Sequence, residues 1–588
     1  MASAQPPGAP PPPPPAPPPP PTAPLPLPGL RSLKQVPVPA VPGVGQYVRN
    51  QQALIALGKV FFWDVQAGSD GKTACASCHF HAGADHRRQN QLAPPHSATT
   101  ALTSPNRTLT AGEFPFHRAG VVSGPPMVAG SAGVIARRFL NVTPGAADEN
   151  GADLVASRFN KNGLLTRQVS SRNTPSVINA VFNVRQLWDG RASPVFNGVS
   201  ELGEADAAAA VQAWRGGRLV REVVRLQNSS LASLAVGPVL NPIEMSYEGR
   251  SFGLVGRKLL ALRPLGRQRV AVTDSVLGPL ANASGNGLVA ALSYRALIEA
   301  AIDPAYWQAP VSGTQNQMEA NFSLYWGLAI QAYLSTLVSN DSPLDRSLEG
   351  VAGALSPLER QGLQTFGAPN SGSCAGCHAG AEFTAASFTE SVRRGGFFRI
   401  GVTPIADDRG LGNLPTALAS QITRGAASAN GMFKTPGLRN VEFTGPFFHD
   451  GSQATLEQVL EFYGRNGDFP ADGNLGPGMG RIRLSPQERT AVVAFLKALT
   501  DDRVRFQRAP FDHPSLCVPV GHEESAAGTL VKDSKDGRFA SSAADRFALI
   551  PAVGRAGATA PLQTFDELLR GIGNDGTRAN ALTQACVP

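Results

Sequence analysis

Two short cysteine motifs carry the clearest chemistry in this sequence of 588 residues. They are Cys75-Ala-Ser-Cys78-His79 and Cys374-Ala-Gly-Cys377-His378. Two cysteines three positions apart can form thioethers with both vinyl groups of one porphyrin, and the adjacent histidine then lies under the iron. Each motif therefore predicts one covalently attached haem c. The predicted porphyrin attachments and iron ligands are Cys75, Cys78, His79, Cys374, Cys377 and His378.

Zinc is the alternative to haem, because paired cysteines can also be zinc ligands. His81 and His86 lie near the first motif. Zinc sites need paired cysteine or histidine clusters at set spacings. Both motifs have the haem-attachment spacing instead, and each follows a predicted helix. We therefore expect two haem groups rather than zinc.

The sixth ligand of each iron would decide what that haem does. An iron with two strong protein ligands passes electrons, whereas an iron with an open face can bind peroxide or dioxygen. Composition does not choose between these two outcomes. The candidate sixth ligands are His81, His86, His96, His117, His449, Tyr463 and the methionines.

The composition fits a soluble globular protein, with 42% hydrophobic and 16% charged residues. The net charge is +8, and the basic residues are scattered, which fits a solvated basic surface or a preference for an acidic partner rather than nucleic-acid binding. No run of eighteen apolar residues exists, so we expect no membrane span. Cys517 and Cys586 are left over from the haem motifs and are predicted to form a disulfide.

Covalent haem attachment in bacteria is usually completed outside the cytoplasm, so we expect a periplasmic or secreted protein. The residues from Met1 onward lack the charged and apolar regions of a signal peptide. We therefore expect that an export signal is missing from this chain.

The apolar spacing predicts a mainly α-helical fold, because strand signals are few. A helix precedes each haem motif, so the two halves repeat a small helical cytochrome unit. Ser356, Pro357 and Glu359 form a capping-box helix start before the second motif. Helices are predicted over residues 46–64, 205–226, 252–262, 288–301, 318–338, 356–365 and 564–572.

The sequence predicts two cytochrome c-like haem domains with long loop insertions and a C-terminal extension. The proline-rich start cannot build a core and is predicted to be a disordered tether. The predicted boundaries are a tether over 1–45, an N-terminal haem domain over 46–340 with insertions 81–165 and 193–230, a C-terminal haem domain over 341–505, and an extension over 506–588.

Several longer motifs surround the haem sites. They are Arg172-Asn173-Thr174-Pro175-Ser176, Trp188-Asp189-Gly190-Arg191-Ala192, Gly237-Pro238 followed by Glu244-Met245, Phe433-Lys434-Thr435-Pro436-Gly437-Leu438-Arg439-Asn440, and Thr444-Gly445-Pro446-Phe447-Phe448-His449-Asp450-Gly451. In order and spacing they resemble the bacterial dihaem cytochrome c peroxidase family. The resemblance covers roughly residues 46–80, 165–260 and 315–500.

This resemblance implies a peroxide-reacting N-terminal haem and an electron-transferring C-terminal haem. It places Glu244 over the peroxide-binding face, where a carboxyl group can move a proton between the two oxygens. It places Trp188 between the haems, in electron transfer. It also implies a catalytic role for Pro238, haem binding by Arg439, and a calcium ion held through Asn173, Thr444 and Pro446.

The sequence departs from the peroxidases of this family at three places. Leu234 stands where they have a glutamine that can hydrogen-bond peroxide. The region of their distal histidine falls in the long insertion, where His96 is the nearest candidate. Tyr463 stands where they have the methionine ligand of the second haem, and a tyrosine there resembles the MauG-type enzymes that oxidise protein side chains. A phenolate favours Fe(III), whereas a thioether favours Fe(II).

The main hypothesis is a dihaem peroxidase-type enzyme. Hydrogen peroxide would react at the first haem, and an electron-donor protein or a side chain of a partner protein would be oxidised. One alternative is an electron-transfer or redox-sensing cytochrome without turnover. Another is a dioxygen-using oxygenase of the rubber-oxygenase type, although Glu244 argues against it because those enzymes lack that residue.

Overall fold

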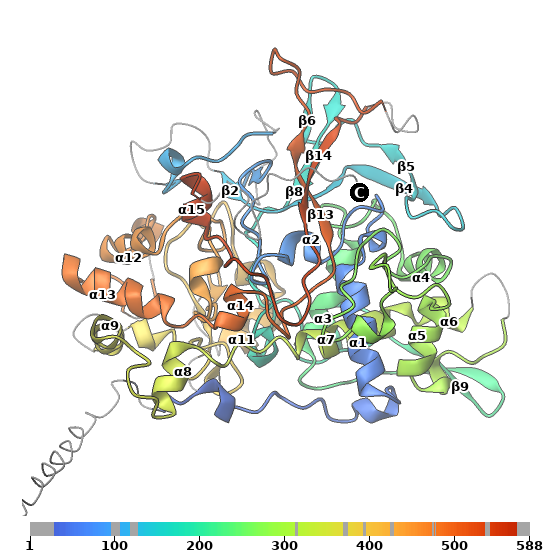
Figure 1. Ribbon diagram of the computed structural model, residues 1–588, viewed down its shortest axis with the longest axis horizontal. Helices are drawn as coiled ribbons and strands as arrows, with labels where there is room; N and C mark the ends of the chain where they lie inside the picture. Colours follow the sequence, from blue (N-terminus) through green and yellow to red (C-terminus); the bar gives the residue numbers. More distant parts are fainter. Residues whose placement is uncertain are drawn as a thin grey trace, which may run out of the picture.

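The computed structural model describes residues 27, 29–95, 106–117, 127–311, 316–368, 374–391, 395–423, 428–472, 475–476, 478–534 and 541–572. Among these residues, no helix is both long enough and apolar enough to cross a membrane. The helix before the first haem motif, α1 (Gln51–Trp63), and the helix before the second, α9 (Pro357–Gly367), lie well apart, on the right and the left of the view (Figure 1). Short strands lie above them, and the fold is loosely mainly α-helical.

The helix before the first motif is α1 (Gln51–Trp63), and it packs along α7 (Phe322–Leu334). A Cβ atom on Gly58 would overlap the carbonyl oxygen of Ala329, so glycine allows the two helices to touch. Gly58 weakens the helix by sequence criteria, yet it sits at the closest point of this contact. Helices α3 (Ser230–Ala235), α4 (Phe252–Leu260), α5 (Tyr294–Ala301) and α6 (Gln317–Ala320) complete this core.

The second motif is preceded by α9 (Pro357–Gly367), which packs against α13 (Pro486–Lys497) in the same manner. A Cβ atom on Gly362 would overlap the carbonyl oxygen of Ala491. The capping box predicted at Ser356 is present, and Ser485 opens α13 with another one. The remaining helices here are α8 (Pro343–Leu348), α11 (Thr416–Thr423), α12 (Leu456–Gly464) and α14 (Asp502–Arg505).

The strands form seven antiparallel pairs among the described residues. Most lie in the predicted insertions and extension, where the apolar spacing gave little signal. They are β1 (Leu92–Ala93), β2 (Val128–Ala129), β3 (Ala132–Ile135), β4 (Arg137–Asn141), β5 (Asn150–Asp153), β6 (Asn160–Lys161), β7 (Leu164–Leu165), β8 (Arg167–Val169), β9 (Val211–Arg215), β10 (Arg218–Glu222), β11 (Phe397–Phe398), β12 (Phe433–Lys434), β13 (Leu516–His522) and β14 (Asp545–Ile550).

The helix predicted over 205–226 is wrong, because this segment is the hairpin β9–β10. Gly216 and Gly217 both have positive φ angles, and they form the turn that reverses the chain. The predicted helix over 564–572 is present as α15 (Phe565–Leu569), opened by a capping box at Thr564.

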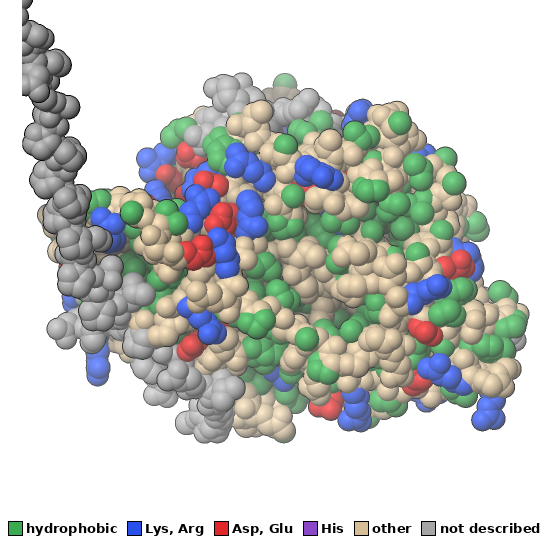
Figure 2. Space-filling model, turned by 60° about the horizontal axis from the view of Figure 1, so that its bottom comes forward, with side chains coloured by type: hydrophobic (Ala, Val, Ile, Leu, Met, Phe, Trp, Pro, Cys, Tyr) green, Lys and Arg blue, Asp and Glu red, His purple; other side chains and the backbone are tan. Residues whose placement is uncertain are grey.

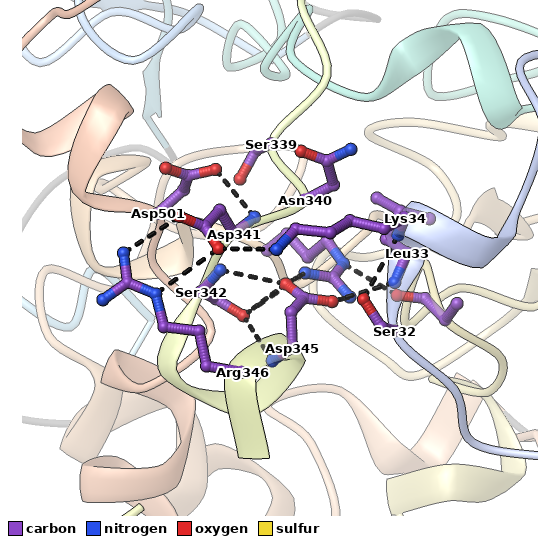
Figure 3. A network of polar contacts seen from close by, with 12 residues as sticks. Ser32, Leu33, Lys34, Ser339, Asn340, Asp341, Ser342, Asp345, Arg346 and Asp501 are labelled. Atoms are coloured by element: carbon purple, nitrogen blue, oxygen red, sulfur yellow. Dashed lines mark hydrogen bonds and ion pairs between the residues drawn. The ribbon is translucent and has the colours of Figure 1, made fainter. Parts of the chain in front are cut away.

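The predicted disordered tether extends too far along the chain, because residues 29–45 pack onto the protein. Leu33 is buried, and its backbone N–H donates to the Asp345 carboxylate at 2.8 Å. The Lys34 ammonium pairs with Asp341 at 2.8 Å and Glu349 at 3.0 Å (Figure 3). Residues 1–26, which contain most of the prolines of the predicted tether, lie outside the described part of the chain.

The scattered basic residues of the sequence are also dispersed in space. Figure 2 shows lysine and arginine side chains interspersed with aspartate and glutamate on one face.

We predict that Asp345→Asn destabilises the core around the second motif by about 3–5 kcal/mol, because it leaves the buried Arg439 guanidinium without its counter-charge. Burial raises the pKa of Asp345, but Arg439 outweighs burial and lowers it to about 2. The stabilisation is therefore present above about pH 4 and is lost as the pH falls toward about 2.

Urea unfolding followed by circular dichroism measures the difference in the free energy of unfolding between wild type and variant. It should be large near pH 7 and should shrink near pH 3. An equal difference at both pH values would contradict the assignment. Glu349→Gln, at a solvent-exposed carboxylate of the same network, should have a much smaller effect.

Candidate functional site

The first haem motif forms the short helix α2 (Ala76–His79), with Cys75 at its N-cap. The Nδ1 atom of His79 lies 2.8 Å from the carbonyl oxygen of Gly83. A proton on Nδ1 would donate to this oxygen and leave Nε2 available for an iron ion. Burial lowers the pKa of His79, which keeps the imidazole neutral, as a metal ligand must be.

The second motif begins with a turn of 3-10 helix over Cys374–Gly376. The Nδ1 atom of His378 lies 3.2 Å from the carbonyl oxygen of Phe383, so its Nε2 is also available. Burial lowers the pKa of His378 to about 4. The two halves thus orient their histidines through the same kind of backbone contact.

The four motif cysteines are in the thiol form, and the residues around them fit covalent haem. A largely apolar cavity adjoins the second motif, and its walls include Cys374, Cys377 and His378. An apolar cavity beside two thiols and a neutral imidazole suits a porphyrin. The described residues contain no cluster of three or more cysteine, histidine or carboxylate side chains suited to zinc, so the zinc alternative gains no support.

Glu244 lies beside the first motif. Its neighbour Met245 places its Sδ atom 3.9 Å from Cys75 Sγ. The thiol pKa values of Cys75 and Cys78 are raised mainly by burial, and the Glu244 charge contributes to both. Asn241 donates from Nδ2 to Glu244 Oε1 at 3.0 Å. The structure therefore brings Glu244 to the haem-attachment cysteines.

The Glu244 carboxyl group has a perturbed acidity. Burial raises its pKa to about 6, although Arg191 acts in the opposite direction. A carboxyl group with a pKa near neutrality can both accept and return a proton at ordinary pH. The sequence motif Trp188-Asp189-Gly190-Arg191 thus contributes a charge at Glu244, a role that sequence reasoning did not assign.

Trp188 lies on the wall of the second haem cavity, three residues before Arg191. Its indole N–H donates to the carbonyl oxygen of Asn173 at 2.7 Å, and its ring centroid lies 6.2 Å from that of His449. One short segment therefore touches the second cavity at Trp188 and acts on Glu244 through Arg191. The role of Trp188 in electron transfer between the haems stays a prediction.

Tyr463, on α12, also lines the second cavity. Burial raises the pKa of its hydroxyl well above the ordinary value, and the nearby Cys377 and Cys374 contribute. His449 and Met479 line the same cavity, so it contains three of the sixth-ligand candidates. The tyrosine therefore lies where a ligand of the second haem could lie.

Arg439 lies on the wall of this cavity, but its guanidinium is hydrogen-bonded to other groups of the protein. It forms a bidentate pair with Asp345 at 2.6 and 2.9 Å, and its Nε donates to the carbonyl oxygen of Ala381 at 2.7 Å. Lys434 is a second buried cation on the same wall, and burial lowers its pKa to about 8. Its place in the motif before Thr435 was visible in the sequence, but sequence reasoning gave it no role.

The three predicted calcium ligands lie together. The Asn173 side-chain amide contacts the Pro446 carbonyl oxygen, and Thr444 lines the same cavity wall. The Asn173 backbone N–H also donates to the His449 carbonyl oxygen at 2.7 Å. Asn173 belongs to the first half of the chain and the others to the second, so this contact joins the two halves. Pro238, the remaining predicted catalytic residue, begins the 3-10 turn Pro238–Leu240 that leads toward Glu244.

The histidine candidates for the sixth ligands lie in different places. The Nε2–H group of His117 donates to the Oδ2 atom of Asp450 at 2.9 Å. The His449 ring stacks on Phe433 with centroids 3.6 Å apart. The His81 and His86 rings stack on each other at 3.5 Å, and His96 lies outside the described residues.

The C-terminal extension packs against the first half. His513 stacks on Trp63 with ring centroids 4.6 Å apart. Arg167, from the strand β8, pairs with Asp545 on β14 at 2.8 Å, and both side chains are largely buried. Cys517 is disulfide-bonded, and Cys586 lies outside the described residues, so their pairing stays a prediction.

A model of the di-haem cytochrome c peroxidase family matches residues 148–353. The cytochrome c551 peroxidase of Nitrosomonas europaea is 27% identical over 339 residues, which cover 57% of this chain and 67% of that protein. The methylamine utilization protein MauG of Methylophilus methylotrophus is 30% identical over 179 residues, which cover 30% of this chain and 48% of that protein. The chain thus spans about two thirds of one relative and about half of the other.

Two solved structures are similar to this chain at a low level. A MauG-like protein associated with microbial copper homeostasis is 21% identical, with a TM-score of 0.42, over 81% of this chain and 96% of that one. The diheme peroxidase BthA of Burkholderia thailandensis is 20% identical, with a TM-score of 0.41, over 79% of this chain and 90% of that one.

The matched segment carries Trp188, Glu244 and the helices α3 to α7, whereas both haem motifs lie outside it. Residues 148–353 of this chain are therefore similar to the di-haem cytochrome c peroxidase and MauG family, and the chain is longer than the relatives it matches.

Proposed function

We propose that this protein is a c-type dihaem oxidoreductase that reduces hydrogen peroxide at the haem held by His79. Cys374, Cys377 and His378 would hold the second haem, which would relay oxidising equivalents. An electron-donor protein or a side chain of a partner protein would be oxidised. The family similarity supports the two haems and the peroxidase class, and the site geometry supports the division of roles.

The position of Glu244 carries this proposal. It combines proximity to the first pair of haem-attachment cysteines with a pKa of about 6. When bound, the first haem supplies an iron that binds peroxide and exchanges electrons with it. Glu244 accepts a proton from the oxygen near the metal and returns it to the leaving oxygen, which departs as water. Peroxide takes up two electrons and two protons in total and yields two water molecules.

The neighbours of Glu244 define how the proton is held. Asn241 donates to Glu244 Oε1 and leaves Oε2 for the substrate. Arg191 favours the ionised carboxylate, whereas burial and Glu201 favour the protonated form. These opposing influences place the group between its two forms near neutral pH, as an acid–base residue requires.

Trp188 and Tyr463 favour a MauG-like division of labour over that of a simple peroxidase. Trp188 is the aromatic side chain that reaches from the Arg191 segment into the second cavity. Phenolate ligation by Tyr463 would lower the potential of the second haem and favour Fe(III). Such a haem is a poor acceptor from a high-potential donor, so oxidation of a partner-protein side chain fits it better.

Two further properties belong to this proposal. Calcium would bind where the Asn173 amide meets the Pro446 carbonyl oxygen and would join the two halves of the chain. The protein would act in the periplasm or after secretion, because haem attachment to Cys-x-x-Cys-His motifs is usually completed there in bacteria. Calcium removal by a chelator should loosen the junction between the halves.

Electron paramagnetic resonance of the ferric protein tests the proposal directly. A high-spin signal from one iron at rest, lost on addition of hydrogen peroxide, is the expected result. Two low-spin signals that peroxide leaves unchanged would instead favour an electron-transfer cytochrome. A pyridine haemochrome assay should give two haems per chain.

We predict that Glu244→Gln slows the reaction with hydrogen peroxide on the order of 100-fold, because the amide cannot accept the proton. In the wild type, the second-order rate constant should fall as the pH drops through about 6, where the carboxyl group keeps its proton. Stopped-flow absorbance at several pH values measures both effects. Glu201→Gln is the matched control and should keep most of the rate above about pH 7. An unchanged rate in Glu244→Gln would refute the acid–base role.

We predict that Tyr463→Phe alters the spectrum of the second haem alone, because the phenyl ring cannot ligate iron. Magnetic circular dichroism and redox titration distinguish the two haems. Tyr325→Phe, which removes a buried hydroxyl outside this cavity, is the control and should leave both spectra unchanged. If neither haem spectrum moves in Tyr463→Phe, Tyr463 is not a ligand.

A further inference from the structure

A fully buried ion cluster lies behind the Glu244 loop, and no role has yet been given to it. Its centre is Glu149, which immediately precedes β5 within the 81–165 insertion. The Glu149 carboxylate lies 2.7 Å from Arg250 Nη1 and 2.6 Å from Lys258 Nζ. Ser69 donates from Oγ to the same carboxylate at 2.7 Å. Burial alone would raise the pKa of Glu149, but Arg250 and Lys258 lower it to about 2.

Arg250 connects this carboxylate to both sides of Glu244. Its Nη2 donates to the carbonyl oxygen of Val239 and, at 3.2 Å, to that of Met245. Its Nη1 donates to the carbonyl oxygen of Ala67 at 3.0 Å as well as to Glu149. One guanidinium thus holds the backbone before Glu244, the backbone after it, and the segment that leads to the first haem motif.

The loop before Cys75 is fixed by the same cluster. The backbone N–H of Ser69 donates to the Met245 carbonyl oxygen at 2.9 Å, and Lys258 Nζ donates to the Gly68 carbonyl oxygen at 2.8 Å. Ser69 Oγ also accepts from the backbone N–H of Tyr247 at 2.8 Å. The segment before the haem-motif thiols and the segment that carries Glu244 are therefore hydrogen-bonded to the same buried cluster around Glu149.

The strand β3 closes the outer side of the Glu244 loop. A Cβ atom on Gly133 would overlap the carbonyl oxygen of Ile243 and would lie 2.5 Å from that of Glu244. Glycine is therefore required for this approach. Gly133 and Glu149 belong to the same insertion, so the insertion holds the loop from two directions.

We propose that Glu149 is a positioning residue that fixes Glu244 relative to the haem on Cys75 and Cys78, acting through Arg250. This inference rests on the proposed function, because it assigns the insertion to the same peroxide site. A buried cluster with one carboxylate and two cations is a costly way to stabilise a loop. The cluster instead holds the Glu244 loop in a single position. This position matters because a displacement of about 1 Å at a reacting group can cost on the order of 100-fold in rate.

The test compares Glu149→Gln with Glu149→Asp and with a matched control, Asp274→Asn. Asp274 is another buried carboxylate of the first half, paired with Lys59 at 2.8 Å, and it contacts neither segment of the cluster. All variants are compared at full haem content. The readouts are the resting resonance line shape of the first haem and the pH profile of the reaction with hydrogen peroxide.

In Glu149→Gln we expect the rate constant to fall on the order of tenfold and its midpoint near pH 6 to move. The line shape of the first haem should broaden, because Glu244 no longer occupies one position. Glu149→Asp should recover part of both signals, and Asp274→Asn should match the wild type. A wild-type line shape and pH profile in Glu149→Gln would overturn the inference.

Two outcomes separate this inference from the proposed function. If Glu149→Gln and Glu244→Gln both change the line shape but neither slows peroxide, positioning holds and the proposed function fails. If Glu244→Gln slows peroxide while Glu149→Gln changes neither readout, the function holds and positioning fails. Should Glu149→Gln not fold, Arg250→Lys keeps the charge but cannot reach both carbonyl oxygens, and it should give the same changes.

Discussion

The close contact between two helices supports each haem motif. In the first half α1 touches α7 at Gly58, and in the second half α9 touches α13 at Gly362. Each contact excludes a side chain, so the helix that leads into the motif has a fixed position. The motif histidine then follows within a short distance, and a backbone carbonyl oxygen orients its imidazole ring. The same construction, used twice, produces two haem sites in one chain.

The junction between the halves is built from polar contacts rather than from a shared apolar surface alone. Arg172 bridges Asp189 of the first half and Asp408 of the second, and Asn173 contacts the Pro446 carbonyl oxygen. Trp188 lies directly beside these contacts. The residues that hold the halves together are therefore the ones that define the space between the two haem sites.

The insertions and the extension surround the first haem site. β3 presses on the Glu244 loop through Gly133, and Arg167 links β8 to Asp545 of the extension. The same segments also reach the second half, because Phe565 of α15 packs with Ala454 and the Phe116 backbone N–H donates to the Ser452 carbonyl oxygen at 3.0 Å. The additional length of this chain therefore contacts both halves.

The sequence by itself determined the two haem-attachment motifs, the family resemblance and most core helices, because these depend on short-range patterns. Cysteine spacing, the capping box at Ser356 and the apolar period of α7 are local properties. Only the tertiary structure decided the rest. It turned residues 205–226 into a hairpin, packed Leu33 against the second half, and surrounded Glu149 with two cations. These outcomes depend on contacts between residues far apart in the chain, which no local pattern specifies.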